Sequence, residues 1–273
     1  MESSVFEGTL VNMSYPQIEK MSQENAPVLI PISVIEEHGP HLCTGVDLYL
    51  TQCVCSKIQE KLHQENLDAI IAPPFYWGVN SITNGFMGSF NISQETTKRL
   101  LYEIIQNFET WGFKNVFLVS FHGDFKHMKT IADITLEIQE NLTIKTYYLA
   151  EQGLFHQLKY NDLPICFVPV QLEASKINVE PDFLDIHAGA NETSWMALEF
   201  PTMVDFNVAK KLKPTQMEPK DMKKWSLGGN AAKELTPLGY CGNPANIQLE
   251  KINRVEIEVV NKYADCIKNV LGL

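Results

Sequence analysis

Acidic and imidazole side chains lie close together directly after the first apolar segment of the chain. Residues 27–35 form a short, β-branched and almost continuously apolar run, which is typical of a strand buried on both faces of a parallel sheet. Glu36 and His38 follow this run, and Asp47 comes shortly afterwards. Because alternate residues of an extended strand point to the same side, Glu36 and His38 can reach one location, whereas Glu37 points away.

A second pair of the same kind follows another apolar segment. His122 and Asp124 come directly after residues 115–121 and, like the first pair, are two residues apart. In open α/β sheets, sites form just beyond the carboxyl ends of the strands, so both pairs and Asp47 are expected at one edge of a sheet.

The combined set holds two imidazoles and three carboxylates. Such nitrogen and oxygen ligands suit Zn²⁺, Mn²⁺ or Fe²⁺, and the set is too rich in carboxylate for a structural zinc site of the thiolate type. A carboxylate between two sites can bridge a pair of ions, which generate a hydroxide near neutral pH and polarise a carbonyl. The residues therefore indicate hydrolase chemistry. A polar loop whose histidines satisfy buried backbone groups is the alternative that stays open.

The elements that must position these residues alternate along the chain. Strands are expected at residues 27–35, 68–75, 115–121 and 144–150, and helices at 48–66, 93–111, 126–141, 188–200 and 255–271. Residues 151–185 show no clear pattern. The alternation predicts an α/β sandwich with a mostly parallel sheet and right-handed crossovers, and without a repeat or a long linker residues 1–273 are expected to form a single domain.

Composition narrows the class of protein. The 273 residues are 45% hydrophobic and 20% charged, which excludes disordered and collagen-like chains. A net charge of −11 makes nucleic acid and anionic membranes poor partners. The first residues lack the basic start of a secretory signal, so we expect a cytoplasmic protein. Its six cysteines form no CxxC pair and are expected to be reduced thiols.

Five short motifs are spaced along the chain. They are Glu36-x-His38-Gly39-Pro40-His41-Leu42 followed by Asp47, Gly85-Phe86-Met87-Gly88-Ser89, His122-Gly123, His187-Ala188-Gly189-x-x-Glu192-Thr193-Ser194, and Gly239-x-x-Gly242-Asn243-Pro244. In this order they resemble the creatininase (creatinine amidohydrolase) family, and the resemblance extends over about residues 5–250.

The resemblance implies a three-layer α/β/α fold, a binuclear divalent-metal centre and hydrolysis of an amide-type C–N bond, usually in a small cyclic or formyl substrate. Glu36 and His122 would hold one metal ion, His38 and Asp124 the other, and Asp47 would bridge them. Creatininase has a glutamate at the position of Asp124, so the aspartate is shorter but keeps a carboxylate. Members of the family commonly form hexamers, which predicts a homo-oligomer.

The resemblance also implies catalytic roles. His187 would return a proton to the leaving nitrogen, and Asp124 or Glu192 would take the proton from the nucleophile. In creatininase a glutamate directly precedes this histidine, whereas here the residue is Ile186. Residues 151–186 lack the tryptophans that close over creatinine, so the sequence does not favour creatinine itself as the substrate.

A glycine-rich loop at residues 76–90 is expected to shape the substrate pocket, because its glycines let the backbone approach a ligand closely. We predict substrate contacts from Trp77, Asn84, Gly88 and Ser89, against the alternative of a long surface loop. His41 is expected to orient a metal ligand.

These observations favour a metal-dependent amidohydrolase in which a metal-bridging hydroxide attacks a carbonyl or formamide carbon of a small molecule. Two alternatives stay open. A relative with the same metals can act on a peptide or a cyclic ketone, and a non-catalytic relative can bind a small molecule or serve as an assembly subunit.

Overall fold

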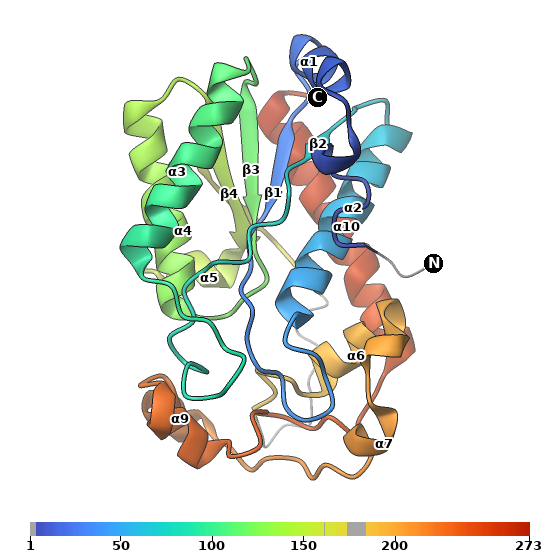
Figure 1. The fold of residues 1–273 in the computed structure, drawn as a ribbon, viewed down its shortest axis with the longest axis vertical. Helices are drawn as coiled ribbons and strands as arrows, with labels where there is room; N and C mark the ends of the chain where they lie inside the picture. Colours follow the sequence, from blue (N-terminus) through green and yellow to red (C-terminus); the bar gives the residue numbers. More distant parts are fainter. Residues whose placement is uncertain (1–3, 161, 174–183) are drawn as a thin grey trace.

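A five-stranded parallel sheet forms the centre of the protein. The computed structural model describes residues 4–160, 162–173 and 184–273, and the strand order is β2-β1-β3-β4-β5 (Figure 1). The strands are β1 (Val28–Pro31), β2 (Ile70–Ile71), β3 (Asn115–Val119), β4 (Lys145–Glu151) and β5 (Phe167–Val170). The four predicted strands are confirmed with shorter or shifted bounds, and β5 lies in the segment where the sequence showed no clear pattern.

Helices connect the strands and continue beyond them. The α-helices are α1 (Tyr15–Gln23), α2 (Val46–Gln64), α3 (Gln94–Thr110), α4 (Phe125–Asn141), α5 (Gln152–Gln157), α6 (Ala190–Glu199), α7 (Phe206–Ala209), α8 (Met222–Trp225), α9 (Gly229–Leu235) and α10 (Leu249–Leu271), with 3-10 turns at Leu10–Asn12, Pro201–Met203 and Pro219–Asp221. Helix α10 begins earlier than predicted. Only Ile252 is buried among its first six residues, so the apolar period that would have indicated this part of the helix is weak.

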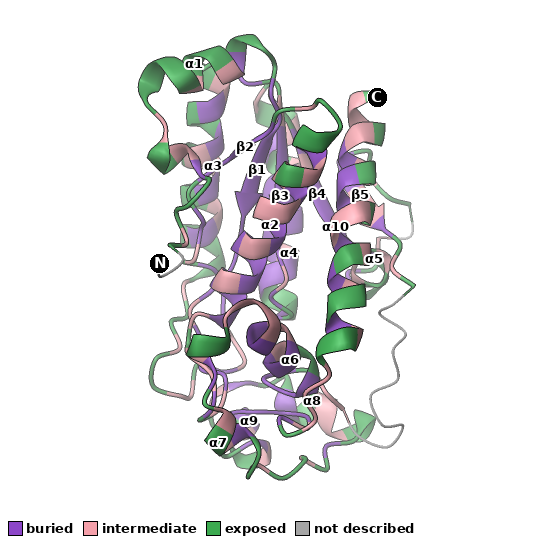
Figure 2. Ribbon diagram, turned by 90° about the vertical axis from the view of Figure 1, so that its right-hand side faces the viewer, coloured by how far each residue is buried: buried purple, intermediate pink, exposed green. Residues whose placement is uncertain are grey.

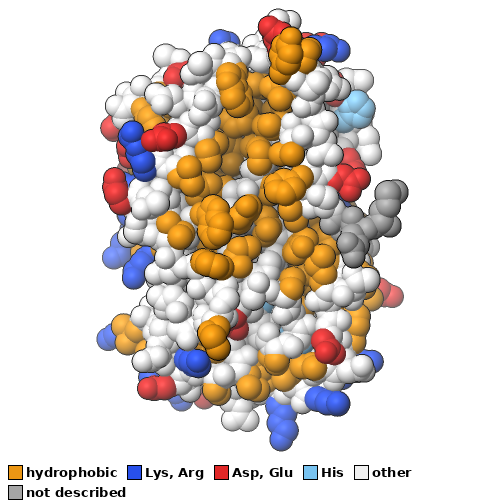
Figure 3. Space-filling view, viewed as in Figure 1, with side chains coloured by type: hydrophobic (Ala, Val, Ile, Leu, Met, Phe, Trp, Pro, Cys, Tyr) orange, Lys and Arg blue, Asp and Glu red, His pale blue; other side chains and the backbone are white. Residues whose placement is uncertain are grey.

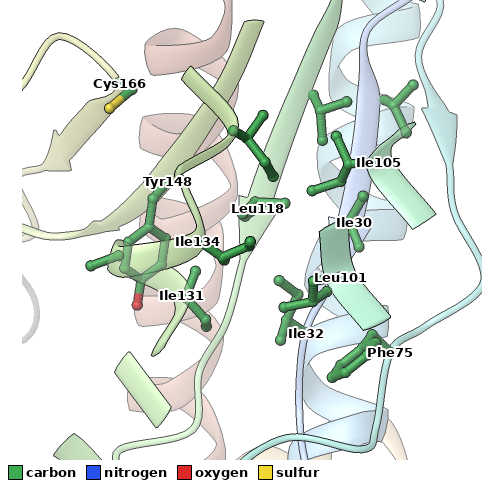
Figure 4. Close-up of a cluster of buried hydrophobic side chains, with 14 of the residues drawn as sticks. Ile30, Ile32, Phe75, Leu101, Ile105, Leu118, Ile131, Ile134, Tyr148 and Cys166 are labelled. Atoms are coloured by element: carbon green, nitrogen blue, oxygen red, sulfur yellow. The ribbon is translucent and has the colours of Figure 1, made fainter. Parts of the chain in front are cut away.

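The strands are buried on both faces, and this creates three layers. Residues of β1 alternate between two apolar clusters, so that Ile30 contacts the cluster that contains α3 and α4, and Leu29 contacts the cluster that contains α2 and α10. Figure 4 shows Ile30 and Leu118 of the sheet facing side chains of α3 and α4. In Figure 2 the sheet is buried between the helices, and the outer sides of these helices are exposed. The predicted α/β/α sandwich is therefore confirmed.

The chain segments that follow β1 and β3 run toward the end of the molecule where α6, α7 and α9 lie (Figure 1). This is the edge of the sheet where the sequence predicts the site. Among the described residues, no helix combines the length and apolar character that crossing a bilayer requires. All six cysteines are unpaired, as predicted.

Candidate metal centre

Side chains from the ends of β1 and β3 meet in one buried cluster. Glu36 follows β1, Asp47 lies in the first turn of α2, and His122 follows β3. His122 Nδ1 lies 3.1 Å from Glu36 Oε1 and 3.0 Å from Asp47 Oδ2, and all three side chains are buried. The two predicted strand ends therefore converge.

A second group lies directly beside the first. His38 Nε2 is 3.7 Å from Asp47 Oδ1 and 3.7 Å from Glu192 Oε2, and Glu192 belongs to the first turn of α6. Asp47 thus presents one carboxylate oxygen to each group, Oδ2 to His122 and Oδ1 to His38. This is the arrangement that a ligand bridging two metal ions requires.

The distances and donor atoms of both groups fit a divalent metal ion. Metal–ligand bonds of about 2.0–2.2 Å at tetrahedral angles place neighbouring ligand atoms roughly 3.4 Å apart, which matches the separations above. His38 Nδ1 lies 3.1 Å from the backbone oxygen of Glu36, which can only accept, so Nε2 keeps its lone pair for the cluster. His38 Nε2 is buried and has no hydrogen-bond partner among the described residues, which leaves its lone pair available to an ion.

His187 lies at the edge of the same cluster. Its Nδ1 is 3.7 Å from Glu36 Oε1, its ring centroid is 4.5 Å from that of His38, and it lines the adjoining cavity. Glu36, His38 and His187 form a third group with ligand-like spacing. The histidine to which the resemblance gives a catalytic role therefore lies beside the two groups of candidate ligands and lines the adjoining cavity.

The cluster favours positive charge in its interior. Burial disfavours the charged form of Glu36, but the neighbouring His122 and His187 outweigh burial and hold the pKa of this carboxyl well below its usual range. Burial lowers the pKa of His187, but the charge of Glu36 and the hydrogen bond that the His187 ring donates to Glu37 raise it to about 10. Carboxylates that hold protons on imidazoles so strongly also attract a metal cation.

Further contacts fix the ligands in place. Thr83 Oγ1 donates to Glu36 Oε2 at 2.5 Å, and the backbone N–H of Ala188 donates to Glu192 Oε2 at 2.5 Å. His41, which the sequence predicts to orient a ligand, contacts the residue after Glu192 and not a candidate ligand itself, since its Nε2 lies 2.8 Å from Thr193 Oγ1. Supporting contacts of this kind orient metal ligands and increase metal affinity.

Thr83 offers a test of this support. We expect Thr83→Val, which keeps the shape of the side chain but removes the hydroxyl, to weaken metal binding by about 10–100-fold. Competition with a fluorescent chelator measures the affinity. Thr83→Ser keeps the hydroxyl and should bind metal like the natural protein, and equal affinities of the valine and serine variants would contradict the role given to Thr83.

The structure does not support the prediction that Asp124 is a ligand of the second ion. Asp124 Oδ1 accepts from the backbone N–H groups of Lys126 and His127, at 2.7 and 3.2 Å, and thereby caps α4. Its Oδ2 accepts from the backbone N–H and the hydroxyl of Ser81, at 2.6 and 2.8 Å. The short side chain stays at its own helix N-terminus, and Glu192 stands beside His38 instead.

The predicted substrate contacts of the 76–90 loop are also not brought to the site. A cavity of about 540 Å³ adjoins the cluster, and this loop lines it with Ile82 and Thr83. Trp77 packs against Phe90, with ring centroids 5.4 Å apart. The Ser89 hydroxyl accepts from the backbone N–H of Glu37 at 3.0 Å, so it holds the ligand segment in place. None of the four predicted contact residues, Trp77, Asn84, Gly88 and Ser89, lines the cavity.

Much of the remaining lining of the cavity is apolar. The apolar lining comes mainly from β4, α5, α6, α8 and α10, and its large side chains include Phe121, Leu154, Leu172, Trp195, Met222, Trp225, Val255 and Val259. Trp225 is buried, but the sequence did not indicate that it belongs to the site because the segment before it is mainly polar. The cavity is therefore lined both by the charged cluster and by large apolar side chains.

Comparisons with known sequences identify related proteins. The creatininase family profile, described as creatinine amidohydrolase, matches residues 11–267. A mycofactocin precursor peptide peptidase of Mycolicibacterium smegmatis is 26% identical over 244 residues, which cover 88% of this chain and 84% of that protein. The creatinine amidohydrolase of Pseudomonas putida is 23% identical over 238 residues, which cover 81% of this chain and 82% of that enzyme.

Solved structures share the fold. A creatininase variant described as the Zn-Zn type aligns with a TM-score of 0.71 and 19% identity over 98% of both chains. A structure named creatininase Mn aligns with a TM-score of 0.70 and 19% identity over 96% of this chain and 98% of that chain. The family profile extends over nearly the whole chain, and we conclude that this protein belongs to the creatininase family.

Proposed function

We propose that the protein is a metal-dependent amidohydrolase that cleaves the C–N bond of an amide. The observation that carries this proposal is the position of Asp47, whose two carboxylate oxygens face two separate groups of ligands. One ion would be held by Glu36, Asp47 and His122, and the other by His38, Asp47 and Glu192. Zn²⁺ and Mn²⁺ are the ions to test first, since the names of related creatininase structures contain them.

The residues around the ions would divide the remaining work. Two such ions supply an activated water near neutral pH and polarise the carbonyl of the substrate. Glu192, predicted from the sequence as a proton acceptor, would act as a ligand through its contact with His38. His187 lines the cavity with its imidazole beside the cluster, and it would deliver a proton to the leaving nitrogen.

A peptide is a second candidate substrate beside a small cyclic amide or formamide. The cavity of about 540 Å³ lies within the range of roughly 300–1,000 Å³ that suits ligands of drug size. Its apolar lining, which includes Trp195 and Trp225, would bury apolar side chains or a flat ring. The name of the mycobacterial relative also describes action on a peptide.

A substrate panel tests the proposal. We expect the zinc- or manganese-loaded protein to hydrolyse at least one of a formamide, a lactam and a short peptide with apolar side chains. A chelator should abolish this activity, and added metal should restore it. Faster turnover of the peptide would assign the protein to the peptide-acting class, whereas cleavage of a cyclic ketone without cleavage of any amide would contradict the amidohydrolase proposal.

We also propose that the chain forms a homo-oligomer. Figure 3 shows hydrophobic side chains gathered over much of one face of the molecule. Large exposed apolar residues of the chain include Tyr15, at 81% exposure, and Phe90, at 51%. Broad apolar surfaces of this kind favour association between proteins, and native mass spectrometry measures the number of subunits.

A further inference from the structure

One carboxylate beside the cluster belongs to neither proposed ion position. Glu37 lies between the two ligands of the first strand end, but its side chain points away from them, as the sequence predicts. It is 8% exposed and meets His187 on the far side of the imidazole ring. His187 Nε2 lies 2.8 Å from the backbone oxygen of Glu37 and 3.3 Å from its Oε1.

We propose that Glu37 is the positioning residue that holds the imidazole of His187 for proton transfer. A backbone carbonyl can only accept, so Nε2 carries the hydrogen and donates toward the backbone oxygen and the carboxylate Oε1 of Glu37. The other ring nitrogen, Nδ1, then faces Glu36 and the proposed ion positions, at 3.7 Å from Glu36 Oε1, and is the nitrogen that would exchange a proton with a substrate. A carboxylate that fixes the tautomer and orientation of a histidine in this way is a recurring device in hydrolytic sites.

The carboxylate of Glu37 is itself held in place. Its Oε2 accepts from the backbone N–H of Gly39 at 3.0 Å, which leaves Oε1 for His187. The residue directly before His187 is Ile186, which offers no side-chain acceptor, so the carboxylate reaches the imidazole from the segment after β1.

A glycine makes room for this arrangement. A Cβ atom on Gly239 would lie 1.8 Å from Glu37 Oε2, and the φ angle of this glycine is +73°. Two residues later, Cys241 pairs with His187 through backbone hydrogen bonds, including Cys241 N–H to the His187 oxygen at 2.7 Å. The turn around Gly239 therefore encloses the carboxylate and holds the histidine at the same time, which ties the two side chains into one unit.

Kinetics of the metal-loaded enzyme test this role, which rests on the proposed function. Glu37→Met keeps the length of the side chain beside Gly239 but accepts no hydrogen bond. We expect kcat to fall by about 10–100-fold while KM and the metal content stay near the natural values. Glu37→Gln restores an acceptor oxygen and should recover most of kcat. Unchanged kcat in Glu37→Met, or equal losses in both variants, would overturn the proposal.

Nuclear magnetic resonance of ¹⁵N-labelled histidine separates this inference from the proposed function. In the zinc-loaded protein we expect His187 to show the tautomer with hydrogen on Nε2, and a missing signal in His187→Gln assigns the resonance. In Glu37→Met the signal should broaden or shift toward a mixture of tautomers. The same signal in both proteins would overturn the inference even if hydrolysis is confirmed. Glu37→Ala repeats both measurements if the methionine variant does not fold.

Discussion

Asp47→Ala is expected to remove both metal ions and to lower kcat/KM by roughly 10³-fold or more, since bound metals contribute several kcal/mol to transition-state stabilisation. Asp47 contributes one oxygen to the group around His122 and the other to the group around His38. Its loss leaves each group with only two of its three ligands. Elemental analysis of the purified variant gives the metal content, and steady-state kinetics on the best amide substrate give kcat/KM.

The chain offers a matched control for this substitution. Asp68 is also an aspartate, but it is exposed and pairs with His63 on the surface, away from the cluster. Asp68→Ala changes the net charge by the same amount and should keep the metals and the activity. If Asp47→Ala retains one tightly bound ion and most of the activity, Asp47 does not bridge the two positions.

The second large effect is expected at Glu192. Glu192→Gln should leave about one ion per chain and lower kcat/KM by roughly 100-fold or more, because a neutral amide replaces an anionic ligand of the second position. Asp124→Ala should keep both ions. It should instead lower the free energy of unfolding by about 1–3 kcal/mol, since α4 loses its cap and the Ser81 N–H loses its partner.

Metal content and denaturant unfolding of the two variants measure these effects. The opposite result would have a clear meaning. Loss of one ion in Asp124→Ala, with both ions retained in Glu192→Gln, would show that Asp124 leaves its helix cap to bind metal. The ligand set first expected from the resemblance would then be right, and the position of Glu192 beside His38 would have no role in metal binding.

Much of the fold was predictable because it rests on local patterns. Residues 115–121 are a short, mainly apolar run, which favours a strand buried on both faces, and Ser93 caps α3 by accepting from Thr96 N–H. The convergence of Glu36 and His122 followed from the rule that parallel strands end at one edge. Strand β5 was not predictable, because it is only four residues long and Pro169 interrupts its apolar pattern.

The site was harder to predict where two roles compete for one side chain. An aspartate two residues after a strand histidine suggests a ligand, but an aspartate before a helix also suggests a cap, and only the three-dimensional structure shows which contact Asp124 makes. Glu192 reaches His38 across 154 residues of sequence, a contact that no local pattern indicates. Similarly, Glu37 contacts His187 across 150 residues of sequence, so no local pattern indicates this contact.

The metal content of the natural protein tests the metal centre most directly. The protein would be expressed with ample zinc or manganese, purified without chelators, and analysed for metals and protein concentration together. The position of Asp47 between two groups of ligands predicts about two ions per chain. A value near zero would contradict the metal centre and favour a non-catalytic member of the family.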